Sequence, residues 1–195
     1  ILNSSIIGDK TIYNLYSHSK YIYACTGFGI VVIDIEKEEI KDTYIIGTSN
    51  SQLKVKDIHI SNDTIYALTE NKIKYAALNN GFLSNSSVWS SHSLPNGSDI
   101  DQLESFGDDF FAFGSPKLVF QYSNNQWDTI IYQPNEYLRN VRVINQNLFV
   151  CSLYSIDIYD QNLQKQDELF AYKPNSYMLP NDIIQKDGYY WIADD

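Results

Sequence analysis

The hydrophobic positions of this chain repeat with a period of about forty residues. Five short β-like runs are each centred on one aromatic anchor residue, which is Tyr23, Tyr66, Phe111, Phe149 or Trp191. Successive anchors lie 43, 45, 38 and 42 residues apart. Self-similarity at a fixed period of about 20 to 50 residues is typical of repeat architectures.

Apolar columns flank the anchors at fixed distances. Eight residues before each anchor the chain has Leu15, Ile58, Leu103, Val141 and Ile183. The positions seven and nine residues after the first four anchors are also apolar. Turn residues separate runs that are rich in β-branched and aromatic side chains, so each copy predicts four short strands. Four strands in about 40 to 45 residues are typical of a β-propeller blade.

We therefore predict an all-β fold, a β-propeller of about four and a half four-stranded blades in a single partial domain over 1–195. The predicted blades cover 11–47, 55–92, 100–132 and 138–172, with a half-blade over 181–195. The stretch 162–170 also fits a short helix, but the repeat favours a strand there. The first seven residues resemble the outer strand of a preceding blade, and the last copy stops after its second strand. We therefore expect a fragment of a larger propeller rather than a closed four-blade ring.

Composition and charge narrow the classes of partner. The net charge is −10, whereas nucleic acids and anionic membrane surfaces attract basic proteins, so neither is expected as the main partner. No apolar run approaches the roughly 18 residues of a membrane-spanning helix, and no signal peptide is present. A fragment would expose strand edges, which invite pairing with a second copy, so we expect an edge-paired dimer to reflect the fragment rather than the biological assembly.

One stretch resembles a known family. Thr26–Gly47, TGFGIVVIDIEKEEIKDTYIIG, resembles the N-terminal propeller of PorZ-like proteins of the type IX secretion system of Bacteroidetes. Its Gly-Phe-Gly turn is followed by an apolar strand, Asp34 and a charged hairpin, and the other copies lack that turn. The copies also resemble the two-component-regulator propeller repeat, most clearly at Gly188–Asp195, GYYWIADD.

The resemblance implies a non-enzymatic binding or scaffold module of a periplasmic or cell-surface protein, whose signal peptide lies outside this segment. Implied partners are a secretion-system or sortase protein, or a lipopolysaccharide or other glycan. The alternative is the glycan-sensing propeller of a hybrid two-component sensor. Both interpretations imply a protein without cofactors.

A sialidase-like enzyme is the main catalytic alternative. Such enzymes clamp a carboxylate with three arginines, because guanidinium groups match carboxylates. This chain has only Arg139 and Arg142, and it lacks the Asp-box pattern of such enzymes. We therefore predict no catalytic, cofactor-binding or metal-binding residues, and we leave the ligand-binding residues unassigned.

The histidines and cysteines show no reactive arrangement. His18 is expected in a turn, His59 in an inner strand and His92 in an outer strand, without the mutual spacing of metal ligands. Cys25 and Cys151 occupy the same register on different blades, so we expect two buried free thiols rather than a disulfide.

Acidic and aromatic clusters offer two further candidate binding sites, one for calcium and one for carbohydrate. Asp99 and Asp101 could hold calcium with Ser98 or backbone carbonyls, but we favour solvated turns for this acidic cluster and for those at 108–109 and 194–195. Trp89 and Trp127 are expected in outer strands and Trp191 in the anchor column. We expect these indoles to pack between blades rather than to form a carbohydrate platform.

Overall fold

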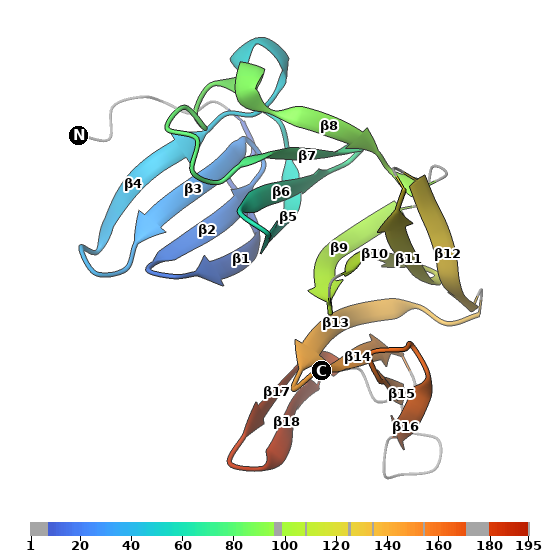
Figure 1. Ribbon diagram of the computed structural model, residues 1–195. Coiled ribbons are helices and arrows are strands. Elements are labelled where there is room, and N and C mark those ends of the chain that lie inside the picture. Colours follow the sequence, from blue (N-terminus) through green and yellow to red (C-terminus); the bar gives the residue numbers. More distant parts are fainter. Residues whose placement is uncertain are drawn as a thin grey trace. The chain divides into compact units, whose positions relative to one another are not determined.

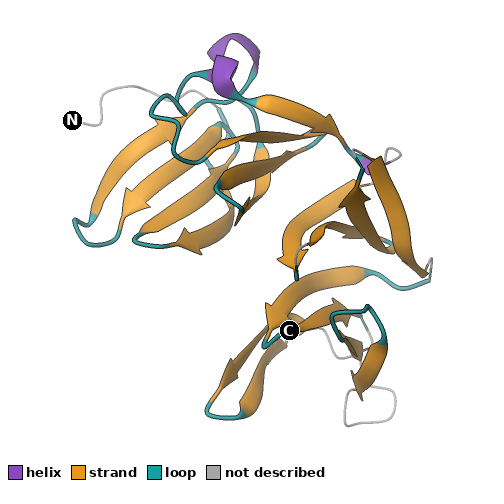
Figure 2. Ribbon diagram, viewed as in Figure 1, coloured by secondary structure: helices purple, strands orange, loops and turns teal. Residues whose placement is uncertain are grey.

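The protein is all-β, as predicted. The computed structural model describes residues 8–95, 99–107, 109–124, 126–133, 135–153, 155–170 and 180–194. In these residues the strands form four antiparallel four-stranded sheets and one two-stranded sheet (Figures 1 and 2). Within each sheet the strands follow one another in chain order, which is the meander of a propeller blade. The prediction of about four and a half β-propeller blades is confirmed.

The chain divides into two compact units, 1–97 and 98–195. The first unit holds β1 (Ile12–His18), β2 (Tyr21–Thr26), β3 (Gly29–Asp34), β4 (Glu39–Tyr44), β5 (Val55–Ser61), β6 (Thr64–Thr69), β7 (Lys72–Ala77) and β8 (Ser90–Ser93). Two short 3-10 turns, η1 (Thr48–Asn50) and η2 (Ser86–Val88), lie in its loops.

The second unit holds two complete blades and a hairpin. Its strands are β9 (Asp99–Phe106), β10 (Asp109–Ser115), β11 (Lys117–Ser123), β12 (Gln126–Gln133), β13 (Leu138–Ile144), β14 (Asn147–Ser152), β15 (Ser155–Tyr159), β16 (Lys165–Phe170), β17 (Pro180–Lys186) and β18 (Tyr189–Asp194). The strand predicted within 162–170 is confirmed as β16. That both units belong to one propeller domain stays a prediction.

Tight turns join the first and second strands of several blades. In the β5–β6 turn, Asn62 and Asp63 have φ values of 47° and 56°. In the β13–β14 turn, Asn145 and Gln146 have φ values of 48° and 62°. Positive φ at both central residues matches the right-handed twist of antiparallel strands, and asparagine tolerates this conformation well.

Each unit has its core between neighbouring blades. In the first unit Tyr23, Ile30 and Val32 of the first blade pack with Ile58 and Ile65 of the second. The second unit packs its blades in the same way, through two clusters. The first surrounds Phe111 and Val141 and also contains Phe106, Phe113, Val119, Leu148, Val150 and Tyr159. The second surrounds Phe149 and Ile183 and also contains Cys151, Ile156 and Ile158. The apolar columns of the repeat therefore stabilise the fold by packing one blade on the next.

Two positional predictions were wrong. Trp89 lies before β8 rather than within an outer strand, because Ser86–Val88 form a 3-10 turn in which the Asn85 side chain accepts from the amide of Ser87. His18 ends strand β1 instead of lying in a turn. The outer strand expected in the first seven residues falls outside the described residues, as do Ser98, Asp108 and Asp195 of the acidic clusters.

Candidate functional site

A polar residue follows a β-bulge in the first strand of every blade. Pairing between the first and second strands shifts by one residue at this point in all five sheets. The residue immediately after the shift is Asn14, Asp57, Gln102, Asn140 or Asp182. We call these five residues the inner-strand polar column.

Four of these side chains stabilise the bulge locally. The side-chain oxygen of Asn14 accepts from the amide of Leu15 at 2.8 Å, and that of Asp57 accepts from Ile58 at 2.8 Å. In the second unit, Asn140 and Asp182 accept in the same way from the next residue, at 2.7 and 2.8 Å. A bulge disrupts the local ladder of hydrogen bonds, and these contacts satisfy amide groups at that point.

In the first unit the polar column also joins neighbouring blades. The Asn14 amide donates to the Asp57 carboxylate at 2.6 Å, and Asp57 is buried. Further along the same strands, the Ile60 amide donates to the Tyr16 hydroxyl at 3.3 Å. Because β1 and β5 are the first strands of their blades, these bonds fix one blade against the next.

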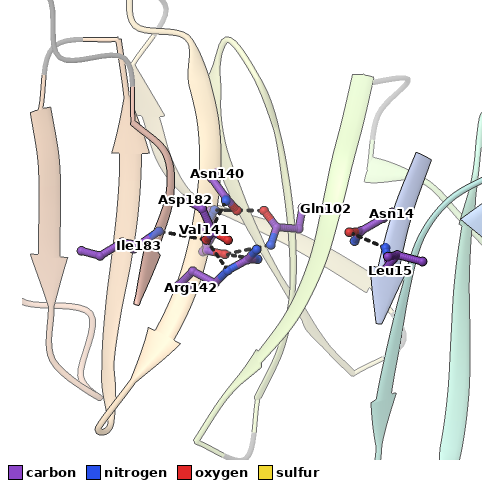
Figure 3. Close-up of polar contacts among 8 residues, drawn as sticks. All are labelled: Asn14, Leu15, Gln102, Asn140, Val141, Arg142, Asp182 and Ile183. Carbon is purple, nitrogen blue, oxygen red and sulfur yellow. Dashed lines mark hydrogen bonds and ion pairs between the residues drawn. The ribbon is translucent and has the colours of Figure 1, made fainter. Parts of the chain in front are cut away.

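The second unit joins its blades by the same kind of contact, with Gln102 and Arg142 as additional, longer side chains (Figure 3). Gln102 exchanges two hydrogen bonds with the backbone of Val141, at 2.8 and 2.9 Å. Asp182 accepts from the Asn140 amide at 3.3 Å and from the Arg142 guanidinium at 2.8 Å. Strands β9, β13 and β17 are thereby linked by polar contacts in addition to their apolar cores.

The sequence contains a polar pattern that predicts this column, and the search for apolar positions did not detect it. All five residues lie nine positions before the aromatic anchor, directly before the apolar column. Every copy has an amide or a carboxylate there. A polar column beside an apolar one in the first strand of every copy indicates a shared structural task, because polar groups packed between strands require partners.

A cleft in the first unit brings cationic and polar side chains together. Its volume is about 260 Å³, and it lies between the loop that carries η1 and the start of β7. Its described lining residues are Gly47, Thr48, Ser51, Leu53, Thr69, Asn71, Lys72, Lys74 and Ser91. None of these is acidic, so the cleft is an electropositive site on a chain of net charge −10. We call it the lysine cleft.

Hydrogen bonds hold the loop side of the lysine cleft. The Asn50 amide donates to the Ser86 hydroxyl at 3.0 Å, and the Ser86 amide donates back to the Asn50 side chain at 2.8 Å. Within the loop, Gly47 and Ser51 approach so closely that a Cβ atom at Gly47 would lie 2.2 Å from the Ser51 carbonyl oxygen. These contacts hold the loop against η2.

The three histidines occupy separate environments. His59 is buried on β5 with its ring edge-on to Tyr16, the ring centres 5.7 Å apart, and burial lowers its pKa to about 4. His92 stacks on Tyr75 at 4.3 Å, and its pKa is also lowered by burial. The part of the chain that the structure describes contains no cluster of side chains suited to a metal ion.

Neither cysteine forms a disulfide, and both thiols are fully buried, as predicted. Cys25 lies on β2 and Cys151 on β14, each two residues after its anchor. Burial raises the pKa of the Cys25 thiol, which opposes formation of the nucleophilic thiolate. Cys25 is thus a packing residue of the first core.

The acidic and aromatic candidates are distributed as follows. Asp99 and Asp101 are exposed on β9.

Trp127 lies in outer strand β12, as predicted, and Trp89 is buried with its indole N–H donating to the Leu83 carbonyl at 2.8 Å. The packing expected for Trp191 is not found, because its side chain is 60% exposed on the two-stranded sheet. Its face lines a cleft of about 340 Å³ with Ile184 and Ile192.

The first two blades carry the sequence pattern of a known propeller family. Residues 1–90 match the family of the N-terminal β-propeller domain of PorZ, from the type IX secretion system. The matched region includes the Gly-Phe-Gly turn of Thr26–Gly47. The resemblance to PorZ-like N-terminal propellers is therefore confirmed.

Solved structures share the fold at low sequence identity. PorZ of Porphyromonas gingivalis, described as an essential bacterial surface component of the type IX secretion system, aligns with a TM-score of 0.71 and 19% identity over 94% of this chain. The extracellular domain of a putative hybrid two-component system of B. thetaiotaomicron aligns with a TM-score of 0.69 and 14% identity over 100% of this chain. BamB of Moraxella catarrhalis aligns with a TM-score of 0.59 and 10% identity over 92% of this chain and 53% of its own length.

The chain spans only 23% of the PorZ chain and 27% of the two-component domain. No curated protein matches it. Among the described residues, no helix is long and apolar enough to cross a membrane.

Proposed function

We propose that this chain is a non-enzymatic binding module of a PorZ-like accessory protein of the type IX secretion system. The match of residues 1–90 to the PorZ N-terminal propeller family is the observation that carries the proposal. By analogy with the surface component from P. gingivalis, the module acts at the cell surface or in the periplasm. Its partner is a secretion-system protein such as the sortase, or a surface polysaccharide.

The mechanism is rigid presentation of loops. The interblade cores and the inner-strand polar column hold the blades of each unit in fixed register, so the loops between strands keep their conformation without a ligand. A preorganised loop surface loses little conformational entropy on binding. The paired hydrogen bonds between Asn50 and Ser86 support this mechanism for the loop over 47–51.

A secretion assay in the producing bacterium tests the proposal. Replacing the segment by an unrelated propeller of similar size should leave cargo proteins unprocessed and retained in the periplasm. Reintroducing the native segment should restore processing and surface attachment. Normal cargo processing in the replacement strain, with the altered protein present at its usual level, would contradict the proposed role.

The second candidate function is ligand sensing in a hybrid two-component system. The alignment with an extracellular two-component domain over the whole chain favours it. Reading the full open reading frame separates the two functions. Further propeller repeats and a C-terminal β-domain support secretion, whereas a membrane span followed by a histidine kinase supports sensing and directs the next experiment to a glycan array.

A further inference from the structure

We infer that the lysine cleft of the first unit binds a small oxyanion of the phosphate or sulfate type. The inference names a ligand class for the binding module proposed above and rests on that proposal only for the premise that its loops bind a ligand. It is carried by the position of two lysines, by the absence of acidic side chains from the described lining and by the polar groups opposite.

The two lysines are neighbours on one face of one strand. Lys72 and Lys74 lie two residues apart on β7, so their side chains leave the same face of the sheet. Lys74 is half-buried and Lys72 is exposed. Two ammonium groups at this spacing repel each other, and an anion between them removes the repulsion.

Among the described residues, neither lysine has an acidic partner. The ion pairs of the described residues include Lys54 with Glu70 beside the cleft, at 3.6 Å, but none involves Lys72 or Lys74. Burial, and secondarily the charge of Lys72, lowers the pKa of Lys74, which agrees with an uncompensated cation. On a chain with ten surplus negative charges, a cleft with two uncompensated cations favours an anionic ligand.

Polar groups around the lysines complete the site. Ser91 is the cross-strand partner of Lys74, and its hydroxyl can donate to an oxyanion, as can those of Thr48 and Ser51 from the opposite loop. The Thr69 hydroxyl is already used, because it donates to the Lys72 carbonyl at 2.7 Å and accepts from the Lys72 amide at 3.1 Å. That turn fixes the backbone of Lys72 and hence the origin of its side chain.

Titration calorimetry with inorganic phosphate tests the inference. We expect the wild-type protein to bind phosphate, and Lys72→Gln and Lys74→Gln each to weaken binding about tenfold, since each removes one charge-assisted hydrogen bond. Lys186→Gln removes the same charge from an exposed strand position of the other unit and should leave phosphate affinity unchanged. Lys74→Arg keeps the charge and should retain most of the binding. Circular dichroism and thermal melting show that each variant is folded.

A second set of ligands identifies the source of the oxyanion. Glucose 1-phosphate, free phosphate and unmodified glucose are titrated in parallel. Tighter binding of glucose 1-phosphate than of phosphate indicates a phosphorylated sugar, equal binding indicates the free anion, and both outcomes support the site. Absence of phosphate and sugar phosphate binding, or equal affinity in wild-type and Lys72→Gln/Lys74→Gln proteins, would overturn it. That result would leave the secretion assay unaffected, so the two proposals fail separately.

Discussion

Asp57 is the buried residue on which the first bulge contact between blades depends. Its carboxylate accepts from the Asn14 amide at 2.6 Å and from the Ile58 backbone at 2.8 Å, while its side chain is almost fully removed from solvent. A buried acceptor with two donors stabilises the fold chiefly because its loss leaves those donors unsatisfied. The polar column therefore contributes to stability through satisfied hydrogen bonds rather than through net charge.

We predict that Asp57→Ala lowers the free energy of unfolding by about 2–3 kcal/mol, because it leaves buried donors without a partner. Urea denaturation followed by circular dichroism measures the change. Asn14→Ala should cost less, and the double variant should show a coupling of about 1 kcal/mol between the two residues. Strictly additive effects would contradict a direct Asn14–Asp57 bond.

His59 makes the stability of the first unit depend on pH. Its pKa falls from about 6.5 to about 4 on folding because burial disfavours the imidazolium form. Below pH 6.5 the unfolded chain therefore binds a proton at this histidine, whereas the folded chain binds it only near pH 4. The free energy of unfolding is therefore highest above pH 6.5 and decreases as the pH falls towards 4. We predict a loss of roughly 2 kcal/mol from this group between pH 8 and pH 5.

The comparison of wild type with His59→Phe isolates this effect. Urea midpoints are measured at both pH values, and the difference between the two proteins removes the contribution of carboxylates common to both. A pH dependence that is the same in both proteins would mean that His59 takes up its proton in the folded state as readily as in the unfolded chain.

At the scale of elements, the turn before β3 requires glycine. Gly29 has a φ of +147°, and a Cβ atom there would lie 2.2 Å from the Tyr44 carbonyl oxygen on the neighbouring strand. Both the backbone conformation and the close approach of the backbone exclude a side chain. This residue ends the Gly-Phe-Gly turn that pointed to the PorZ-like family.

We predict that Gly29→Ala destabilises the first unit by about 2 kcal/mol or more, since it combines backbone strain with a steric clash. Gly81→Ala is the matched control, because no atom lies within 4 Å of its added Cβ and it should change stability by less than about 0.5 kcal/mol. Thermal denaturation of both variants provides the measurement. Equal melting temperatures would show that the turn can move away from Tyr44.

The outer strands differ in how well their edges resist pairing. Strands β4 and β16 contain Lys41 and Lys165, and β8 has only four residues. Strand β12 has eight residues and no lysine, and it exposes Ile130 and Tyr132. Lysines and short lengths discourage edge pairing, so β12 is the outer strand at which we expect an edge-paired dimer to form.

We therefore expect Ile130→Lys to shift any concentration-dependent dimer towards monomer in sedimentation velocity experiments. Ile35→Lys adds the same charge at an exposed residue outside the strands and should leave self-association unchanged. A wild-type protein that stays monomeric at high concentration, or an Ile130→Lys variant that dimerises like the wild type, would contradict pairing at this edge.

At the scale of the whole molecule, the first unit contains a complete core of its own. Every residue of the cluster around Tyr23, Ile58 and Trp89 belongs to 1–97. We predict that residues 1–97 fold alone and unfold cooperatively in urea. Trp89 is the only tryptophan in that segment and is buried, so its fluorescence reports the transition directly. A segment that shows no cooperative transition would mean that the first unit requires the second.

The fold could be predicted from the chain because its information is periodic. Aromatic anchors and apolar columns recur in each copy, and this recurrence predicted the blades and also favoured a strand over a helix at β16. Trp89 was misplaced because the connection before β8 contains a 3-10 turn, which follows from local capping by Asn85 rather than from the repeat. Trp191 was misjudged because its burial depends on what packs against β18, and its own hydrophobicity does not decide that.

The sequence by itself determined the all-β class, the blade period, the buried thiols and the PorZ-like turn, because each follows from local pattern or from register within one copy. Only the tertiary structure placed Asn14 against Asp57, brought Lys72 and Lys74 together with the loop over 47–51, and removed His59 from solvent. These arrangements join residues about 20 to 45 positions apart on different strands and loops. Side-chain chemistry at such separations depends on how strands and blades pack, and a one-dimensional pattern does not record that packing.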